Sequence, residues 1–109
     1  MARAQTYSPQ ARDAVTLLGL EIARERRARR WTIADLAERA GVSHVTVRSA
    51  EKGTLTVAIG TVFEIAAILG IDLFAPPGEI RNLLDRSRDR LALLPSRVRE
   101  AVADIDDDF

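Results

Sequence analysis

The sequence contains no cysteine and few residues that interrupt helices or build sheets. Without cysteine, the 109 residues can form neither disulfides nor thiolate metal sites. Only four prolines and six glycines are present, and β-branched residues do not alternate with polar ones over any long run. This pattern favours an all-α domain. The first residues, "MARAQTYSPQ", lack the apolar segment of a signal peptide, and no run of 18 apolar residues occurs. We therefore expect a cytoplasmic protein that does not enter a membrane.

The residues that catalysis needs are also scarce. His44 is the only histidine, and the chain has neither a glycine-rich phosphate loop nor a His/Glu cluster with metal-ligand spacing. We therefore expect no enzyme activity, no metal and no other cofactor. Three consecutive aspartates near the C-terminus, at 106–108, are interpreted as a solvated tail rather than as a cation site.

Charge is balanced over the whole chain but not along it. Residues 1–30 carry seven arginines and three acidic residues, whereas residues 61–109 carry six arginines and ten acidic residues. A basic front and an acidic back indicate either different partners or one partner and a solvated tail; a merely solvated surface is the alternative. With 47% apolar residues, the length suits one compact domain. We place it at residues 9–94, followed by an acidic tail at 95–109 that we expect to be weakly ordered.

A long first helix is predicted to begin at Ser8 and Pro9, because serine caps helices and proline suits their first position. One face carries an apolar stripe at helical spacing, made of Ala11, Val15, Leu18 and Ile22. Arg26 continues this stripe. A charge on a buried stripe needs a partner of opposite sign.

Two short helices follow, separated by a glycine. Thr32 and Asp35 have the spacing of a capping box at the start of "TIADLAERA", and Gly41 ends that helix. Ser43 caps a third helix that runs to about Lys52. Steeply crossing helices need small contact residues, a tight turn and filling between them, which are supplied by Ala37, Gly41, Val42, Val47 and Ala50. Residues 33–52 therefore fit a helix-turn-helix.

Two further helices are predicted beyond Gly53. The fourth, at about residues 58–69, is almost wholly apolar and is expected to be the central core element. In the loop after it, Leu73 and Phe74 are expected to pack back onto the core. The fifth, at about residues 79–94, is amphipathic and is expected to be partly buried and to form a dimer contact through Ile80, Leu83, Leu84, Leu91 and Leu94.

The segment "WTIADLAERAGVSHVTVRSAEKG" resembles the phage-repressor-like, or Xre-type (Cro/cI-type), helix-turn-helix family of bacterial DNA-binding regulators. The resemblance covers about residues 15–73. It implies a bundle of about five helices that binds double-stranded operator DNA as a homodimer, with the third helix in the major groove.

The resemblance also assigns roles to individual residues. The base-reading set is His44, Val45, Thr46, Arg48 and Ser49. The phosphate contacts are Thr32, Ser43, Lys52 and Thr54. Arg26 and Glu51 match a structural ion pair of the family, which supplies the partner that Arg26 needs. Ordinary surface positions are the alternative for His44 and Arg48. Arg24, Arg27, Arg29 and Arg30 are interpreted as solvated residues, with a position near phosphate as the alternative.

Two features bear on the regulator's role. Ile33 stands where the family often has a glutamine that helps to hold phosphate, so that contact is not expected here. The stretches "GTLTVAIGTVFEIAAILGIDLF" and "LALLPSRVREAVADIDDDF" look like antitoxins of the HipB kind, which repress their own operon and neutralise a HipA-like kinase toxin. The tail residues that would bind such a partner are Val98, Val102, Ile105, Asp106, Asp107, Asp108 and Phe109. The alternatives are a solubilising tail and a stand-alone repressor without a toxin.

Overall fold

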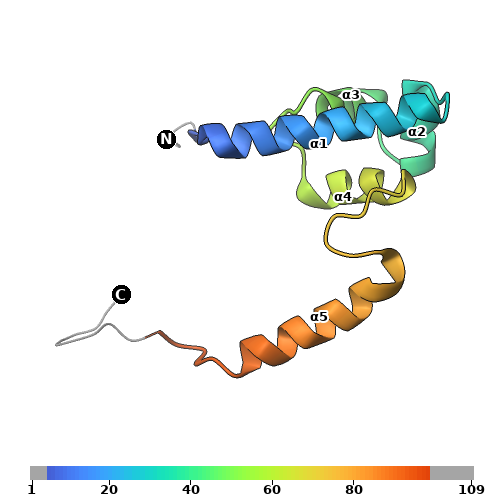
Figure 1. Cartoon of the computed structure of the whole chain (residues 1–109). Coiled ribbons are helices and arrows are strands. Elements are labelled where there is room, and N and C mark those ends of the chain that lie inside the picture. The colour runs from blue at the N-terminus through green and yellow to red at the C-terminus, as the bar shows by residue number, and fades with distance from the viewer. Residues whose placement is uncertain (1–4, 99–109) are drawn as a thin grey trace. The chain divides into compact units, whose positions relative to one another are not determined.

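The computed structural model describes residues 5–98, which form five α-helices and no strand (Figure 1). The helices are α1 (Pro9–Ala28), α2 (Ile33–Ala40), α3 (His44–Glu51), α4 (Ile59–Ile68) and α5 (Pro77–Ala92). The prediction of an all-α fold is confirmed. The chain divides into two units between Leu73 and Phe74, so α1–α4 form one unit and α5 belongs to another. The predicted domain at residues 9–94 thus contains parts of two units, which are described separately.

Side-chain caps start the first three helices where the sequence predicts them. Ser8 Oγ accepts a hydrogen bond from the Ala11 amide at 3.1 Å. Thr32 and Asp35 form the reciprocal capping box: the Asp35 amide donates to Thr32 Oγ1 at 3.0 Å, and the Thr32 amide donates to Asp35 Oδ2 at 2.8 Å. The hydrogen bond from the Thr32 amide, with a further contribution from the Thr32 side chain, favours the ionised carboxylate and so lowers the pKa of Asp35 from its ordinary 3.8.

The core of the first unit lies where its four helices meet. Five large side chains are almost completely buried there: Ile22, Leu36, Val47, Ile65 and Leu69. The predicted small contacts, Ala37 and Ala50, are buried among them. Gly41 makes the turn between α2 and α3 with a φ of 69°, a left-handed conformation that glycine adopts at low cost.

The expectation that the fourth helix is the central core element is wrong. Only one face of α4 is covered, through Ile65, Ala66 and the C-cap residue Leu69. On the other face Ile59 is 72% exposed and Phe63 is 40% exposed. The reason is geometric: a helix on the outside of a small four-helix unit has neighbours on one side only.

The loop after α4 also departs from expectation. Leu73 is 38% exposed, so the expected packing of this side chain back onto the core is wrong, whereas Phe74 belongs to the second unit and its packing onto the core stays a prediction. Phe74 begins the second unit and there lines a pocket of about 210 Å³ with side chains of α5, namely Ile80, Leu83, Leu84 and Ser87. In α5 the apolar stripe is covered only around Leu83 and Leu84, which are half-buried, and the described part of that helix has no fully buried residue.

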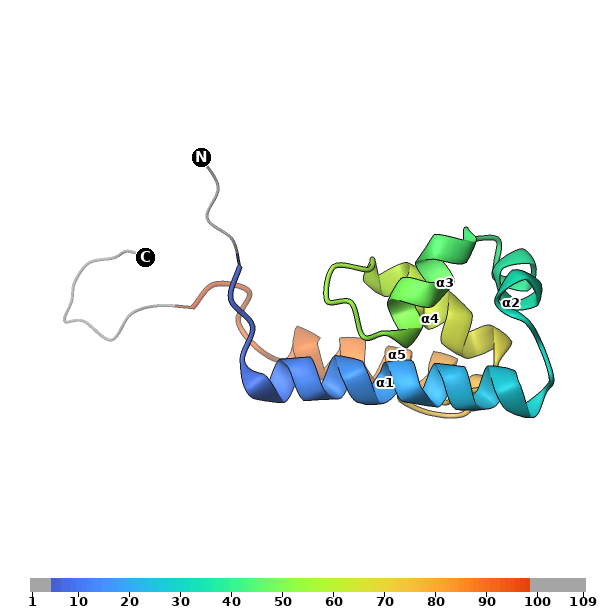
Figure 2. The same cartoon turned by 90° about the horizontal axis from the view of Figure 1, so that it is seen from above.

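Helices α1 and α3 approach each other backbone to backbone (Figure 2). A Cβ atom on Gly19 would lie 2.6 Å from the Ala50 carbonyl oxygen and 2.7 Å from that of Glu51. Gly53, with a φ of 76°, makes a similar approach, because a Cβ there would lie 2.9 Å from the Thr16 Cα. The absence of side chains at these two positions therefore sets how closely α1 lies against the end of α3.

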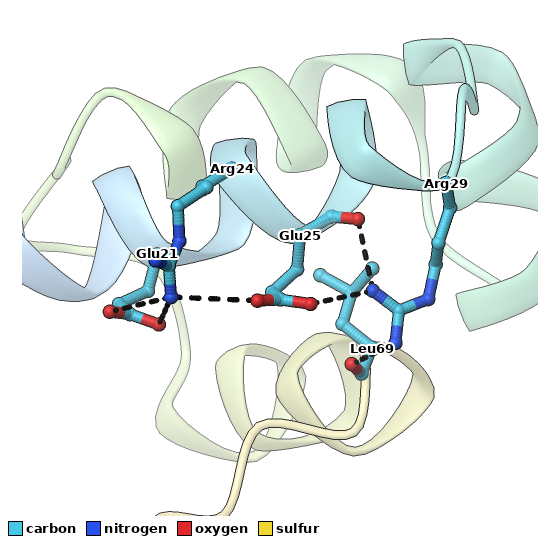
Figure 3. A network of polar contacts seen from close by, with 5 residues as sticks. All are labelled: Glu21, Arg24, Glu25, Arg29 and Leu69. Carbon is cyan, nitrogen blue, oxygen red and sulfur yellow. Dashed lines mark hydrogen bonds and ion pairs between the residues drawn. The ribbon is translucent and has the colours of Figure 1, made fainter.

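A chain of polar contacts joins α1 to the end of α4 (Figure 3). Arg29 Nη2 donates to the Leu69 carbonyl oxygen at 2.7 Å, and its Nη1 donates to the Glu25 carboxylate at 2.8 Å. Arg24 lies 3.2 Å from Glu21 and 3.5 Å from Glu25. The last carbonyls of a helix have no partner within the helix and carry partial negative charge, so the Arg29 guanidinium is well placed to bind one.

Replacing Gly19 with alanine should destabilise the first unit. Although alanine favours helix, its methyl group would clash with two backbone carbonyls of α3, and we expect a loss of about 1–3 kcal/mol, as for overpacked cores. Gly60→Ala in α4 is the matched control: no heavy atom lies within 4 Å of the new Cβ, so the change should stabilise by up to about 1 kcal/mol. Urea unfolding followed by circular dichroism measures both. Equal stability of the two variants would contradict the close contact.

Candidate nucleic-acid interface

Helix α3 has one face that is fixed by packing and one that is open. Val47 and Ala50 point into the core, whereas His44, Val45 and Arg48 are exposed. Because residues three and four apart share a helix face, His44 and Arg48 lie next to each other on the outside, with Val45 beside them. The structure thus brings three of the five predicted base-reading residues together on one open surface.

The other two predicted base readers are less exposed. Thr46 is half-buried, and its hydroxyl lies 2.8 Å from Ser43 Oγ, which also accepts the Thr46 amide at 3.1 Å. Thr46 is thus part of the capped first turn of α3. Ser49 is half-buried on the side of α3 that faces the following loop, and its carbonyl accepts the Thr54 amide at 2.9 Å.

The predicted phosphate contacts are all exposed. Thr32 and Ser43 are the exposed N-caps of α2 and α3, and Lys52 and Thr54 are exposed just after α3. Helix N-termini carry unpaired amides and partial positive charge, which suit phosphate. Ile33, the residue in place of the usual glutamine, is half-buried and packs against the core cluster.

A hydroxyl-rich hollow beside α3 was not predicted from the sequence. It has a volume of about 370 Å³, and its polar lining consists of Thr46, Ser49, Thr54, Thr56 and Thr61. Thr56 and Thr61 come from the loop before α4 and from the start of α4. The threonines of "TLTVAIGT" were the available signal, but their spacing in a loop does not indicate that they converge.

Arg26 and Glu51 hold α3 against α1 from inside. Arg26 Nε and Nη2 donate to the two Glu51 carboxylate oxygens at 2.6 and 3.1 Å, and Nη1 donates to the Trp31 carbonyl at 2.8 Å. The two side chains are only 11% and 10% exposed. The hydrogen bond to Glu51 raises the pKa of Arg26 above its ordinary value, against the opposing effect of burial. The guanidinium is thus fixed as a cation in a two-pronged pair.

Most of the predicted partner-binding tail lies outside the described residues. This applies to Val102, Ile105, Asp106, Asp107, Asp108 and Phe109. Val98, the last described residue, is exposed.

One family model matches part of the chain. Residues 22–74 match the family model described as helix-turn-helix, a span that includes α2, α3 and α4 and the last part of α1. No curated protein and no solved structure matches the chain. The prediction of a helix-turn-helix at residues 33–52 is confirmed. Within the part of the chain that the structure describes, no helix is long and apolar enough to cross a membrane.

Removing one partner of the Arg26–Glu51 pair should be costly. Arg26→Ala leaves the Glu51 carboxylate poorly solvated and without its cation, and we expect a loss of about 3–5 kcal/mol in the free energy of unfolding. The matched control is Arg24→Ala, which breaks ion pairs of 3.2 and 3.5 Å made by an arginine that is 68% exposed, and should cost no more than about 1 kcal/mol. Urea titration gives both values. Losses of the same size would show that the Arg26–Glu51 pair has no special role.

Proposed function

We propose that this protein, whose residues 22–74 form a helix-turn-helix domain, is a sequence-specific DNA-binding transcription regulator. The observation that carries the proposal is the two-sided character of α3. Its inner face is held by the core and by the Arg26–Glu51 pair, and its outer face presents His44, Val45 and Arg48 to solvent. A fixed helix with an open polar face is what entry into the major groove requires.

Each exposed side chain of α3 suits a different feature of a base pair. The guanidinium of Arg48 can donate two parallel hydrogen bonds to O6 and N7 of guanine. Val45, which is 68% exposed, can contact the methyl group of thymine. His44 and Ser49 offer adaptable polar contacts, and Thr46 lies at the start of the same helix. Arg48 is therefore the residue from which we expect the largest single contribution to base preference.

Contacts to phosphate would set the register of α3 in the groove. Thr32 uses its oxygen to cap α2 and still has a hydroxyl proton to donate outward, and the Ser43–Thr46 hydroxyl pair at the start of α3 keeps one proton to donate outward. Lys52 and Thr54 would contact phosphate beyond the other end of α3. Ile33 contributes packing at the position where the related proteins often place an amide, so this protein would make one phosphate contact fewer there.

We further propose that the regulator acts as a homodimer on a two-fold-symmetric operator, with half-sites about one helical turn apart. The exposed leucines at the end of the fifth helix and just beyond it, Leu91, Leu93 and Leu94, support a role of this region in pairing, because a group of exposed apolar side chains marks an interaction surface.

An antitoxin that also neutralises a HipA-like kinase is the more specific hypothesis. Its support is the resemblance of the tail and of the fourth-helix region to HipB-like antitoxins. The acidity of residues 100–109 adds to this, because phosphate would repel the tail from DNA and leave it to a protein. A stand-alone repressor without a toxin is the alternative.

Arg48→Ala should weaken binding to the preferred DNA by about 1–3 kcal/mol and relax preference at one base position. The reason is that a two-pronged contact to guanine discriminates against the other bases. Lys52→Ala is the matched comparison, because a phosphate contact weakens binding to all sequences alike. Fluorescence anisotropy on duplexes with single base changes measures both. Equal loss on preferred and random DNA for Arg48→Ala would make Arg48 a phosphate contact.

Deleting residues 95–109 tests the antitoxin hypothesis. The deletion should leave DNA binding almost unchanged, because the helix-turn-helix lies within residues 22–74, and it should abolish capture of a kinase-like protein encoded beside this gene. Co-purification with and without the tail is the measurement. Capture by the truncated chain would exclude the tail from partner binding, and the absence of any such neighbouring gene would favour the stand-alone repressor.

A further inference from the structure

A groove between α1 and α3 gathers positive charge next to the open face of α3. It has a volume of about 520 Å³ and is lined by Leu20, Ala23, Arg24, Arg27, Arg48, Glu51 and Lys52. Four of these seven residues are cationic, and only one is acidic. We call it the α1–α3 groove.

The carboxylate in the α1–α3 groove does not neutralise these cations. Both Glu51 oxygens are taken by Arg26, at 2.6 and 3.1 Å. Arg24 is paired with Glu21 and Glu25 on its own helix. Within residues 5–98, Arg27, Arg48 and Lys52 have no carboxylate oxygen within 4 Å. Three cations from two helices therefore face one hollow, whose apolar lining comes from Leu20 and Ala23.

Such an arrangement favours an extended anion. Like charges that share a hollow raise its potential, and an anion that enters relieves their mutual repulsion. Two of the three cations, Arg48 and Lys52, also belong to the exposed side of α3, so the α1–α3 groove continues the proposed DNA surface. A polymer that carries a negative charge about every 1.7 Å of its axis can meet cations on both helices at once.

We propose that the α1–α3 groove binds the sugar-phosphate backbone of DNA beside the recognition helix, with Arg27 of α1 as a phosphate contact. This inference rests on the proposed DNA-binding function and extends the contact surface from α3 to α1. Near the end of α1, Arg24 and Arg29 are engaged in ion pairs, whereas Arg27 pairs with none of the described carboxylates and lines the α1–α3 groove. Arg27 is therefore the arginine of this basic helix to which the inference assigns a specific role. The contact is independent of base sequence.

The test is the salt dependence of binding to a short random-sequence duplex by the full-length chain. Each phosphate contact contributes about −0.9 to the slope of log K against log salt, so Arg27→Ala and Arg27→Gln should each make the slope shallower by about 0.9. Arg12→Ala is the matched control, an exposed arginine on the same helix outside the groove, and should keep the wild-type slope. Base preference should not change in any of these variants.

The outcomes separate the two claims. If both Arg27 variants keep the wild-type slope while the wild-type chain binds DNA, the proposed phosphate contact in the α1–α3 groove is wrong. The proposed regulator function is then unaffected. The same shallower slope in Arg12→Ala overturns it as well, since the effect would then belong to the general charge of α1. If the wild-type chain binds no duplex at any salt concentration, the proposed function fails together with the groove.

Discussion

The two-pronged ion pair between Arg26 and Glu51 is the interaction on which the placement of α3 depends. It joins the last part of α1 to the last residue of α3, and its third hydrogen bond reaches the Trp31 carbonyl just before α2. Burial of both side chains makes each charge expensive without the other. The pair therefore sets where α3 ends relative to α1, in the same place where Gly19 lets the two backbones touch.

This internal attachment leaves one face of a short helix packed and the other face open. Val47, Ala50 and Glu51 are committed to packing and to the ion pair. In the described structure His44 and Arg48 take part neither in this packing nor in the ion pair, so packing does not constrain which residues stand at these positions. The capped starts of α2 and α3 bring backbone amides to the borders of the same surface, and Arg29 ties α4 to α1 through the Leu69 carbonyl.

Features set by near neighbours in the sequence were predictable. The caps at Ser8, Thr32 and Ser43 depend on residues three positions away, and the left-handed turn at Gly41 depends on that residue itself. The helix-turn-helix followed from these signals and from the small residues between them. Arg26 stands on an apolar stripe, and this predicted that it needs a partner of opposite charge. The resemblance to the helix-turn-helix family then indicated Glu51 as that partner.

Features set by the three-dimensional arrangement were not predictable. The sequence of an apolar helix does not indicate whether neighbouring helices cover one of its faces or both. The exposure of Ile59 could therefore not be predicted. Gly19 looks like any glycine inside a helix until the crossing with α3 is known. The threonine hollow and the α1–α3 groove likewise combine residues from separate segments, and their charges and hydroxyls acquire a joint meaning only when the helices are placed.

The central claim is that the outer face of α3 reads a DNA sequence. Its most direct test is selection of duplexes from a random pool by the purified full-length chain, followed by sequencing. We expect enrichment of a two-fold-symmetric sequence whose half-sites lie about one helical turn apart, because two copies would each place one α3 in the major groove. Recovery of DNA without any common sequence would contradict it.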